Sequence, residues 1–465
     1  MTLERKQLAI VASLAAVVFV SIFATQTLLW LGLLVFLARL VSRRVSFPRT
    51  PLDGPVLAFC LWTLLSASFS VNPALSHESA SKLVLFLLFY LAIDTLASEA
   101  ARERVLTAAL LGGLALVSLT ILQYFLLGFD TLSLRPRGLL GHYMSASGLT
   151  MGVVVLAAAR LALAREWPRL HPKDGRLLAG LAVAVAVLSA TQAAGVPSFR
   201  VSPLMRHGIG PETFFVLGLA LTGGALAVAR GRWPEPSTAT LLAMLALPLG
   251  SLALVLSQTR NAWLGAVAGL ATVAVVRAPR TLWLLAVAVV AVLAVRPATV
   301  MNRLTLEDDS SRDRYYMWQA GIDMIEDKPV FGQGPGMILL VYPSYRWPEA
   351  PNPRAPHLHD NALQIAAERG LPCLVFWLWW VAAAMGDAWR EARRGAAAGA
   401  PLSASAVCEH AWPALAALGV LVAVLAAGLF EYNFGDSEVL MFVLLTASFP
   451  YALRRQRALL AGARA

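Results

Sequence analysis

Long apolar blocks alternate with short polar stretches along the chain. Most apolar blocks approach the length of about 20 residues that crosses a bilayer as a helix. Candidate spans lie near residues 8–24, 27–41, 54–70, 80–97, 105–127, 143–164, 177–193, 212–229, 239–257, 261–276, 281–296, 370–386, 411–430 and 438–453. This pattern predicts an all-α polytopic membrane protein with about 12–14 transmembrane helices and one long external loop that contains short helices.

The composition supports a membrane protein. Hydrophobic residues make up 58% of the 465 residues and charged residues 14%, whereas soluble domains have about 45–50% and about 25%. The formal net charge is +11, but the basic residues stand in short loops between apolar runs, which favours membrane orientation over nucleic-acid binding. We therefore expect no nucleic-acid partner. The cysteines Cys60, Cys373 and Cys408 lack metal-binding spacing and predict no disulfide framework.

The distribution of Lys and Arg predicts the orientation. Alternate loops are basic, from Arg5 near the N-terminus to Arg457 near the C-terminus, and cytoplasmic loops collect such residues. Both termini are therefore expected inside, with the first apolar run retained as a helix rather than cleaved as a signal peptide. The chain then divides into N-terminal transmembrane helices (1–296), an external loop (297–369) and C-terminal transmembrane helices (370–465).

Several basic residues fall on the external side and break this charge rule. Polar groups at membrane depth are costly unless they are paired or bind a ligand, and a guanidinium fork matches phosphate oxygens. The pattern favours a phosphate-bearing ligand such as a lipid pyrophosphate, with anchoring to lipid phosphates or snorkelling of the lysine as alternatives. The candidates are Lys82, Arg137, Arg260, Arg314 and Arg354, and Arg135, Arg200 and Arg206 share their side.

The first part of the external loop predicts a helix over residues 313–326. Tyr315, Trp318, Ile322 and Ile325 recur at helical spacing and form one apolar face. This face suits contact with the membrane surface or with the helical bundle. The two aromatic residues on it fit either interfacial anchors or platforms for a sugar.

A Gly-rich turn over residues 332–336 and a second helix follow. We expect this helix to begin around His359 and to end at Arg369, with Gly370 as its C′ residue. The positive end of the helix dipole would keep the His359 ring neutral, which suits a general base.

The two histidines of the HLH triplet, His357 and His359, also permit a zinc site. Catalytic zinc needs a third protein ligand, and the nearby candidates are Asp360, Glu368 and the acidic residues 307–309. Because these acids also suit a solvated surface, the sequence favours a site without metal.

Four motifs resemble those of the O-antigen ligase and polymerase superfamily. They are RGLLGHYMSASG (137–148), SQTRNAWLG (257–265), RYYMWQAGIDMIEDKPVFGQGPG (314–336) and HLHDNALQIAAERGLP (357–372), in this order. The resemblance implies an all-helical membrane fold and an inverting glycosyl transfer without metal or other cofactor. The donor would be a glycan on undecaprenyl pyrophosphate, outside the inner membrane.

The resemblance also implies roles for single residues. Arg260 and Arg314 would hold the pyrophosphate, and His359 would activate the acceptor hydroxyl. Many relatives have asparagine after that histidine, where this chain has Asp360 and then Asn361, so a role for the amide does not carry over directly. Further substrate contacts are expected from Lys82, Arg137, Trp318, Arg354 and His357.

The motifs leave the acceptor open. Lipid A–core would make the protein a ligase, which we favour, because the compact HLHDNALQ loop resembles ligases more closely. A second lipid-linked glycan would make it an O-antigen or exopolysaccharide polymerase, and a protein side chain an O-oligosaccharyltransferase. A transporter or flippase would instead predict polar residues inside several spans, and the spans contain few.

Overall fold

A computed structural model describes residues 2–131, 134–162, 238–277, 309–397 and 412–462, with a few positions between 279 and 286. The predicted spans 177–193 and 212–229, most of 281–296 and the polar segment between the first two lie outside these residues. Within the described part, every regular element is helical. This confirms the all-helical class.

The described helices follow the predicted apolar runs closely. Six of them are long and apolar enough to cross a membrane, and α3 and α18 are shorter apolar helices. The protein is therefore a multi-pass membrane protein, and the total of 12–14 spans stays a prediction. The elements are α1 Leu3–Val17, α2 Ile22–Val41, α3 Asp53–Ser68, α4 Pro73–Ala80, η1 Ser81–Phe86, α5 Leu87–Thr95, α6 Glu99–Leu126, α7 Tyr143–Leu161, α10 Thr238–Leu256, α11 Arg260–Arg277, α14 Asp309–Asp327, α15 Ile338–Tyr345, α16 Asn361–Ala397, α18 Trp412–Ala427, η3 Asn433–Gly435, α19 Ser437–Ala447 and α20 Phe449–Gly462.

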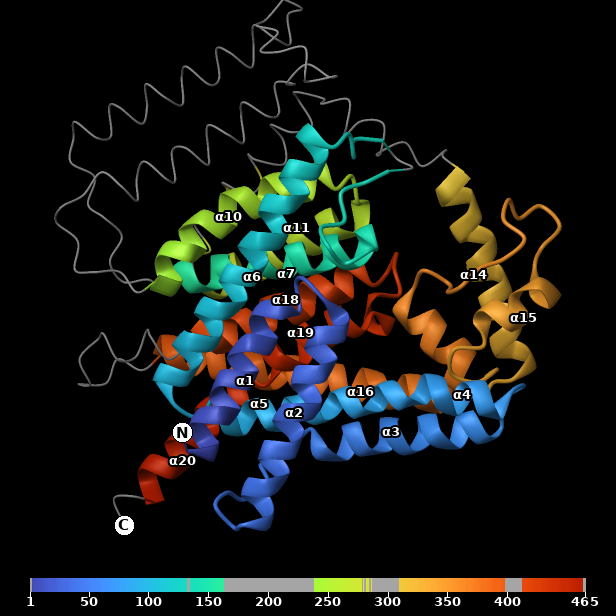
Figure 1. Ribbon diagram of the computed structural model, residues 1–465. Helices are drawn as coiled ribbons and strands as arrows, with labels where there is room; N and C mark the ends of the chain where they lie inside the picture. Colours follow the sequence, from blue (N-terminus) through green and yellow to red (C-terminus); the bar gives the residue numbers. More distant parts are fainter. Residues whose placement is uncertain are drawn as a thin grey trace, which may run out of the picture.

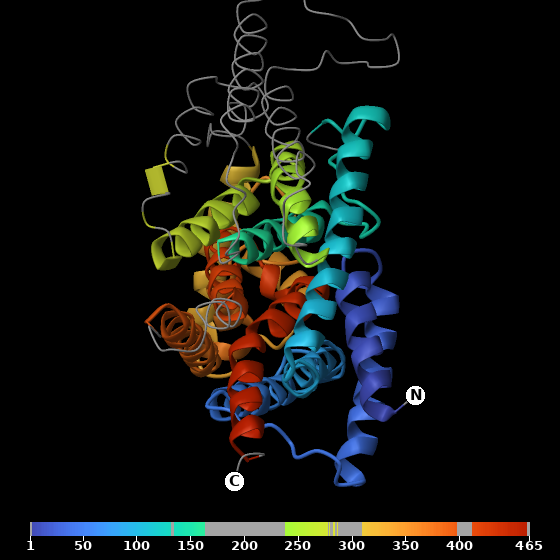
Figure 2. The ribbon, with the colours of Figure 1, turned by 90° about the vertical axis from the view of Figure 1, so that its left-hand side faces the viewer.

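The apolar helices form one bundle (Figures 1 and 2) in which α11 packs along α18 and α10 packs against α6 and α7. Small residues allow the closest contacts, as is usual between membrane helices. Added Cβ atoms at Gly265 and Gly269 of α11 would meet the backbone oxygens of Ala423 and Gly419 in α18 within 2.5 and 2.9 Å. Figure 1 shows both chain termini at the end of the bundle away from α14 and α15.

The helices α14 and α15 and the first part of α16 share a small core of their own, which includes Met317, Met324 and Leu358. On α14, the packed face differs from the predicted one, because Tyr315 and Ile322 are 56% and 42% exposed. A contact of this exposed face with the membrane surface stays a prediction. Helix α15 was not predicted, because Pro343 lies inside it and proline usually ends a helix.

A break at Gly370 divides α16 into a short helix before the glycine and a longer apolar helix after it. Gly370 has φ 80° and ψ 165°, a conformation that residues with a Cβ adopt at a cost. An added Cβ would lie 1.9 Å from the carbonyl oxygen of Val330. The N–H of Leu371, freed by the break, donates to the carbonyl of Pro329 at 2.8 Å. The helix end predicted at this glycine is therefore present.

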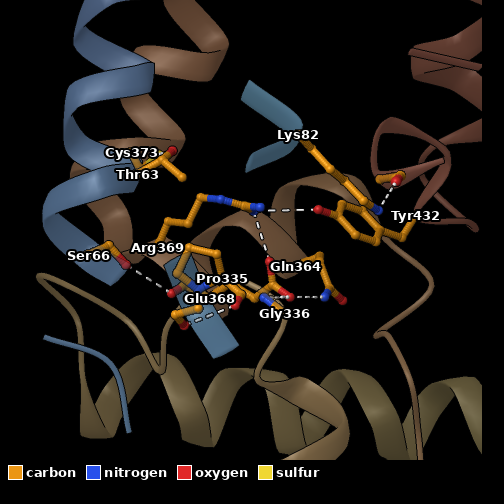
Figure 3. A network of polar contacts seen from close by, with 12 residues as sticks. Thr63, Ser66, Lys82, Pro335, Gly336, Gln364, Glu368, Arg369, Cys373 and Tyr432 are labelled. Carbon is orange, nitrogen blue, oxygen red and sulfur yellow. Dashed lines mark hydrogen bonds and ion pairs between the residues drawn. The ribbon is translucent and has the colours of Figure 1, made fainter. Parts of the chain in front are cut away.

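The Gly-rich turn, residues 332–336, wraps around this break. The amides of Gln333 and Gly334 donate to the carbonyls of Ala367 and Glu368 at 2.9 and 2.8 Å. The Glu368 carboxylate accepts the Gly336 amide at 2.9 Å and forms an ion pair with Arg369 at 2.9 Å. Figure 3 shows the Arg369 side chain between Glu368 and Tyr432. The predicted turn thus attaches the external segment to the bend of α16.

We predict that Gly370→Ala destabilises the protein by at least about 2 kcal/mol, because a left-handed backbone and a steric overlap would coincide. Gly386→Ala in the same helix is the matched control, since its Cβ would meet only the flexible end of Arg390 at 3.8 Å. The control should change stability by no more than about 1 kcal/mol. Thermal unfolding in detergent measures both, and equal midpoints would contradict the role of the break.

Candidate functional site

Four arginines line one pocket of about 640 Å³, which we call the arginine pocket. Arg135 precedes α7, Arg260 is the first residue of α11, and Arg312 and Arg314 belong to the first turns of α14. These segments are far apart in the sequence, so tertiary structure alone brings the four guanidinium groups together. A pocket with this lining suits a ligand with several negative charges.

A strained hairpin places Arg260 in the pocket. Gln258, between α10 and α11, has φ 52°, and its side-chain amide donates to the carbonyl of Asp130 at 3.0 Å. This bond ties the hairpin to the loop that carries Arg135. Arg260 itself donates to Oγ of Ser311 at 3.2 Å, which joins the hairpin to α14.

Apolar and aromatic side chains form the rest of the lining. Tyr315, Tyr316 and Trp318 come from α14, and Phe430 comes from the connection between α18 and α19. The rings of Trp318 and Phe430 lie 6.0 Å apart. The pocket therefore combines cationic groups with surfaces on which a sugar ring or an apolar chain could lie.

His359 lies beside this pocket and is held by a buried carboxylate. Its Nδ1 is 2.9 Å from Oε2 of Glu431, and Glu431 is only 4% exposed. An ionised carboxylate can only accept, so the proton of the neutral ring is on Nδ1 and Nε2 keeps its lone pair. Glu431 directly follows Phe430 of the arginine pocket. This arrangement can take a proton beside the arginine pocket.

The family model for O-antigen ligase matches residues 243–378. This segment is similar to the O-antigen ligase family. The match confirms the resemblance to the O-antigen ligase and polymerase superfamily and supports glycosyl transfer of that general type, on lipid-linked glycans in a membrane. A comparison with curated proteins finds no match.

The O-antigen ligase segment contributes three of the four pocket arginines and both histidines, whereas Arg135 and Glu431 lie outside it. Among the predicted site residues, the pocket brings together Arg260, Arg314 and Trp318. Arg135 and Arg312 were missed as site residues, although Arg135 had been noted among the external arginines. Glu431 was not predicted at all. The sequence feature that could have revealed it is an acidic residue in the short connection between the last two predicted spans.

Three predicted substrate contacts lie outside the arginine pocket. Arg137 is exposed and donates to the carbonyl of Gly141 at 3.3 Å. Lys82 donates to the carbonyl of Gly435 at 3.0 Å and lines a separate cavity of about 120 Å³. Arg354 is exposed on the loop before the histidines. Substrate binding by these residues stays a prediction.

The helix after the histidines begins at Asn361, two residues later than predicted. His359 has φ 53° and precedes the N-cap Asp360, whose Oδ1 accepts the Leu363 amide at 2.7 Å. Asp360 therefore caps the helix. The Asn361 side chain donates to Oδ1 of Asn433 at 2.7 Å, and this bond fixes the histidine loop to the connection that carries Glu431.

The charges around the histidine pair favour an ionised Glu431 and a neutral His357. Burial raises the pKa of Glu431, but the hydrogen bond with His359 and nearby positive charge lower it below its usual range overall. Burial, together with His359, lowers the pKa of His357 to about 4. Arg314 contributes to both shifts, which indicates how close the arginine pocket is to the histidines.

Glu431 also supplies the third ligand that the zinc interpretation lacked. The ligand atoms of His357, His359 and Glu431 lie within 4.8 Å of one another. Tetrahedral zinc would separate its nitrogen and oxygen ligands by about 3.3 Å, whereas the His359–Glu431 distance is 2.9 Å and the His357–Glu431 distance 3.7 Å. The closer pair thus has the geometry of a hydrogen bond, and a metal alternative can be tested with a chelator.

Proposed function

We propose that the protein is an O-antigen ligase of the bacterial inner membrane. It would transfer a glycan from undecaprenyl pyrophosphate to lipid A–core on the periplasmic face, with inversion at the anomeric carbon. The observation that carries this proposal is the convergence of four arginines in one pocket beside a histidine on a buried carboxylate. Charge neutralisation and a general base are the two functions that such a transfer needs.

The arginine pocket suits the donor. Arg135, Arg260, Arg312 and Arg314 provide four positive charges for the pyrophosphate, and the aromatic lining offers surfaces for the first sugar or the prenyl chain. When the anomeric C–O bond breaks, negative charge grows on the pyrophosphate oxygen that leaves. Fixed cations next to that oxygen lower the barrier, which is the role that divalent metals have in other phosphate chemistry.

His359 suits activation of the acceptor. Its Nε2 takes the proton of an acceptor hydroxyl while the oxygen of that hydroxyl bonds to the anomeric carbon, and undecaprenyl pyrophosphate departs from the opposite face. Glu431 holds the Nδ1 proton and stabilises the imidazolium that forms, as in other His–carboxylate pairs. The positive φ of His359 strains the backbone, and such strain is common at residues whose exact position is needed for function.

We predict that the purified full-length protein transfers glycan from an undecaprenyl-pyrophosphate donor to lipid A–core in detergent. The product is resolved on a glycan gel, and free undecaprenyl pyrophosphate appears in equal amount. If a second lipid-linked glycan is extended instead, the protein is a polymerase, and the acceptor assignment is wrong.

Turnover should continue in excess EDTA, and inhibition that zinc reverses would revive the metal alternative at His357 and His359.

We predict that His359→Ala lowers kcat by about 10²–10⁴-fold, the usual contribution of a general base, while donor binding persists. Glu431→Gln should lower kcat less and leave KM for the donor unchanged, because it keeps the shape but loses the charge opposite the imidazolium. Steady-state kinetics measure both variants. An equal effect of Glu431→Gln on kcat and KM would indicate a purely structural role.

A second comparison uses two neighbouring arginines. Arg135→Ala should lower kcat/KM for the donor by about 10–100-fold, because one charge-assisted hydrogen bond to the pyrophosphate is lost. Arg137→Ala removes the same charge two residues away but outside the arginine pocket, so its effect on kcat/KM should be smaller if the donor binds in that pocket. The reverse ranking would mean that the donor binds elsewhere.

A further inference from the structure

A second basic pocket lies near both chain termini, and none of its lining residues takes part in the proposed glycosyl transfer. Its volume is also about 640 Å³. It is bounded by the end of α2, the turn at residues 42–46, the junction of α5 and α6, and α20. Figure 1 shows the chain termini at the end of the bundle away from α14 and α15, so this pocket is remote from the arginine pocket.

Four arginines and two acidic residues line this second pocket, which leaves two positive charges uncompensated. The buried carboxylate of Asp94 forms ion pairs with Arg39 and Arg455. Arg455 also donates to the carbonyl of Ser46 at 3.1 Å, which joins α20 to the turn. Glu4 is the other acid, and Arg43 and Arg44 are exposed.

A defined turn holds the two exposed arginines. Arg43 has φ 52°, and its amide donates to the carbonyl of Leu40, while the amide of Arg44 donates to that of Arg39, both at 3.0 Å. A left-handed residue with such bonds is a regular helix C-terminus. The turn therefore keeps two guanidinium groups at the rim of the pocket, where they can bind a phosphate bidentately.

Exposed apolar side chains lie in and beside this pocket. Leu459 lines it at 59% exposure, and Val41 and Phe47, next to the lining turn, are 76% and 46% exposed. A soluble phosphate would gain nothing from these side chains, whereas a phospholipid would place its acyl chains on them. The anionic lipids of the cytoplasmic leaflet attract Lys and Arg side chains close to the membrane surface, and the distribution of Lys and Arg predicts that this end of the bundle is cytoplasmic.

We propose that this second basic pocket binds the phosphate head group of an anionic membrane phospholipid. Arg43 and Arg44 contact the phosphate, and the pair Arg39–Asp94 forms the floor. The site is separate from the glycosyl-transfer site, so the two proposals stand or fall independently.

The test is a lipid titration of the full-length protein in detergent, followed by thermal unfolding. Phosphatidylglycerol should raise the unfolding midpoint saturably, because a ligand of the native state stabilises it, and phosphatidylcholine should not. The double variant Arg43→Gln/Arg44→Gln should weaken the apparent affinity about tenfold or more. Arg393→Gln/Arg394→Gln removes the same charge from the exposed end of α16, outside the pocket, and should keep the parent affinity.

Equal affinities of the two double variants for phosphatidylglycerol would overturn the site. Glycerol phosphate or inorganic phosphate that saturates at the same concentration as the lipid would overturn the lipid as ligand and favour a soluble phosphate. If the Gln variant does not fold, Arg43→Lys/Arg44→Lys and the number of phosphatidylglycerol molecules retained in native mass spectra replace it. No difference from the parent protein in that count would also overturn the proposal.

Discussion

The buried ion pair between Glu368 and Arg369 lies at the break in α16, where the apolar part of this helix meets the small core that α14 and α15 share with its first part. The same carboxylate accepts the amide of Gly336 and the side-chain amide of Gln364, so one group satisfies donors from the turn and from the helix before the break. Removal of one partner from such a buried pair costs about 3–5 kcal/mol. The position of the histidine loop, one helix upstream, depends on this bend.

The described neighbours of the arginine side chains differ between the two ends of the molecule. At the end with the chain termini, buried carboxylates form ion pairs with several guanidinium groups, as Asp94 does with Arg39 and Glu391 with Arg457. In the arginine pocket, none of the described lining residues is acidic. The ion pairs at the first end form a structural network, beside which Arg43 and Arg44 are exposed and line the second basic pocket. The lining of the arginine pocket suits a ligand that carries negative charge.

The membrane helices were predictable because apolar length is a local property of the chain. The residues Arg260, Arg314 and His359 could be chosen because they stand in short sequence motifs that resemble those of a known family. Glu431 and Arg135 could not, because only tertiary packing reveals that a short connection after α18 meets the histidine loop, or that one of two neighbouring arginines enters the pocket. Helix α15 was not predicted because Pro343 lies within it, and a proline in the sequence usually indicates the end of a helix.

The bond between His359 and Glu431 joins residues that are 72 positions apart and separated by the helices α16 and α18. Glu431 is therefore synthesised later than the histidine loop. Under the proposed function, a chain without the last hairpin would retain the histidine but lack the carboxylate that supports proton transfer. The enzyme would then become fully active only when its C-terminal helices are in place.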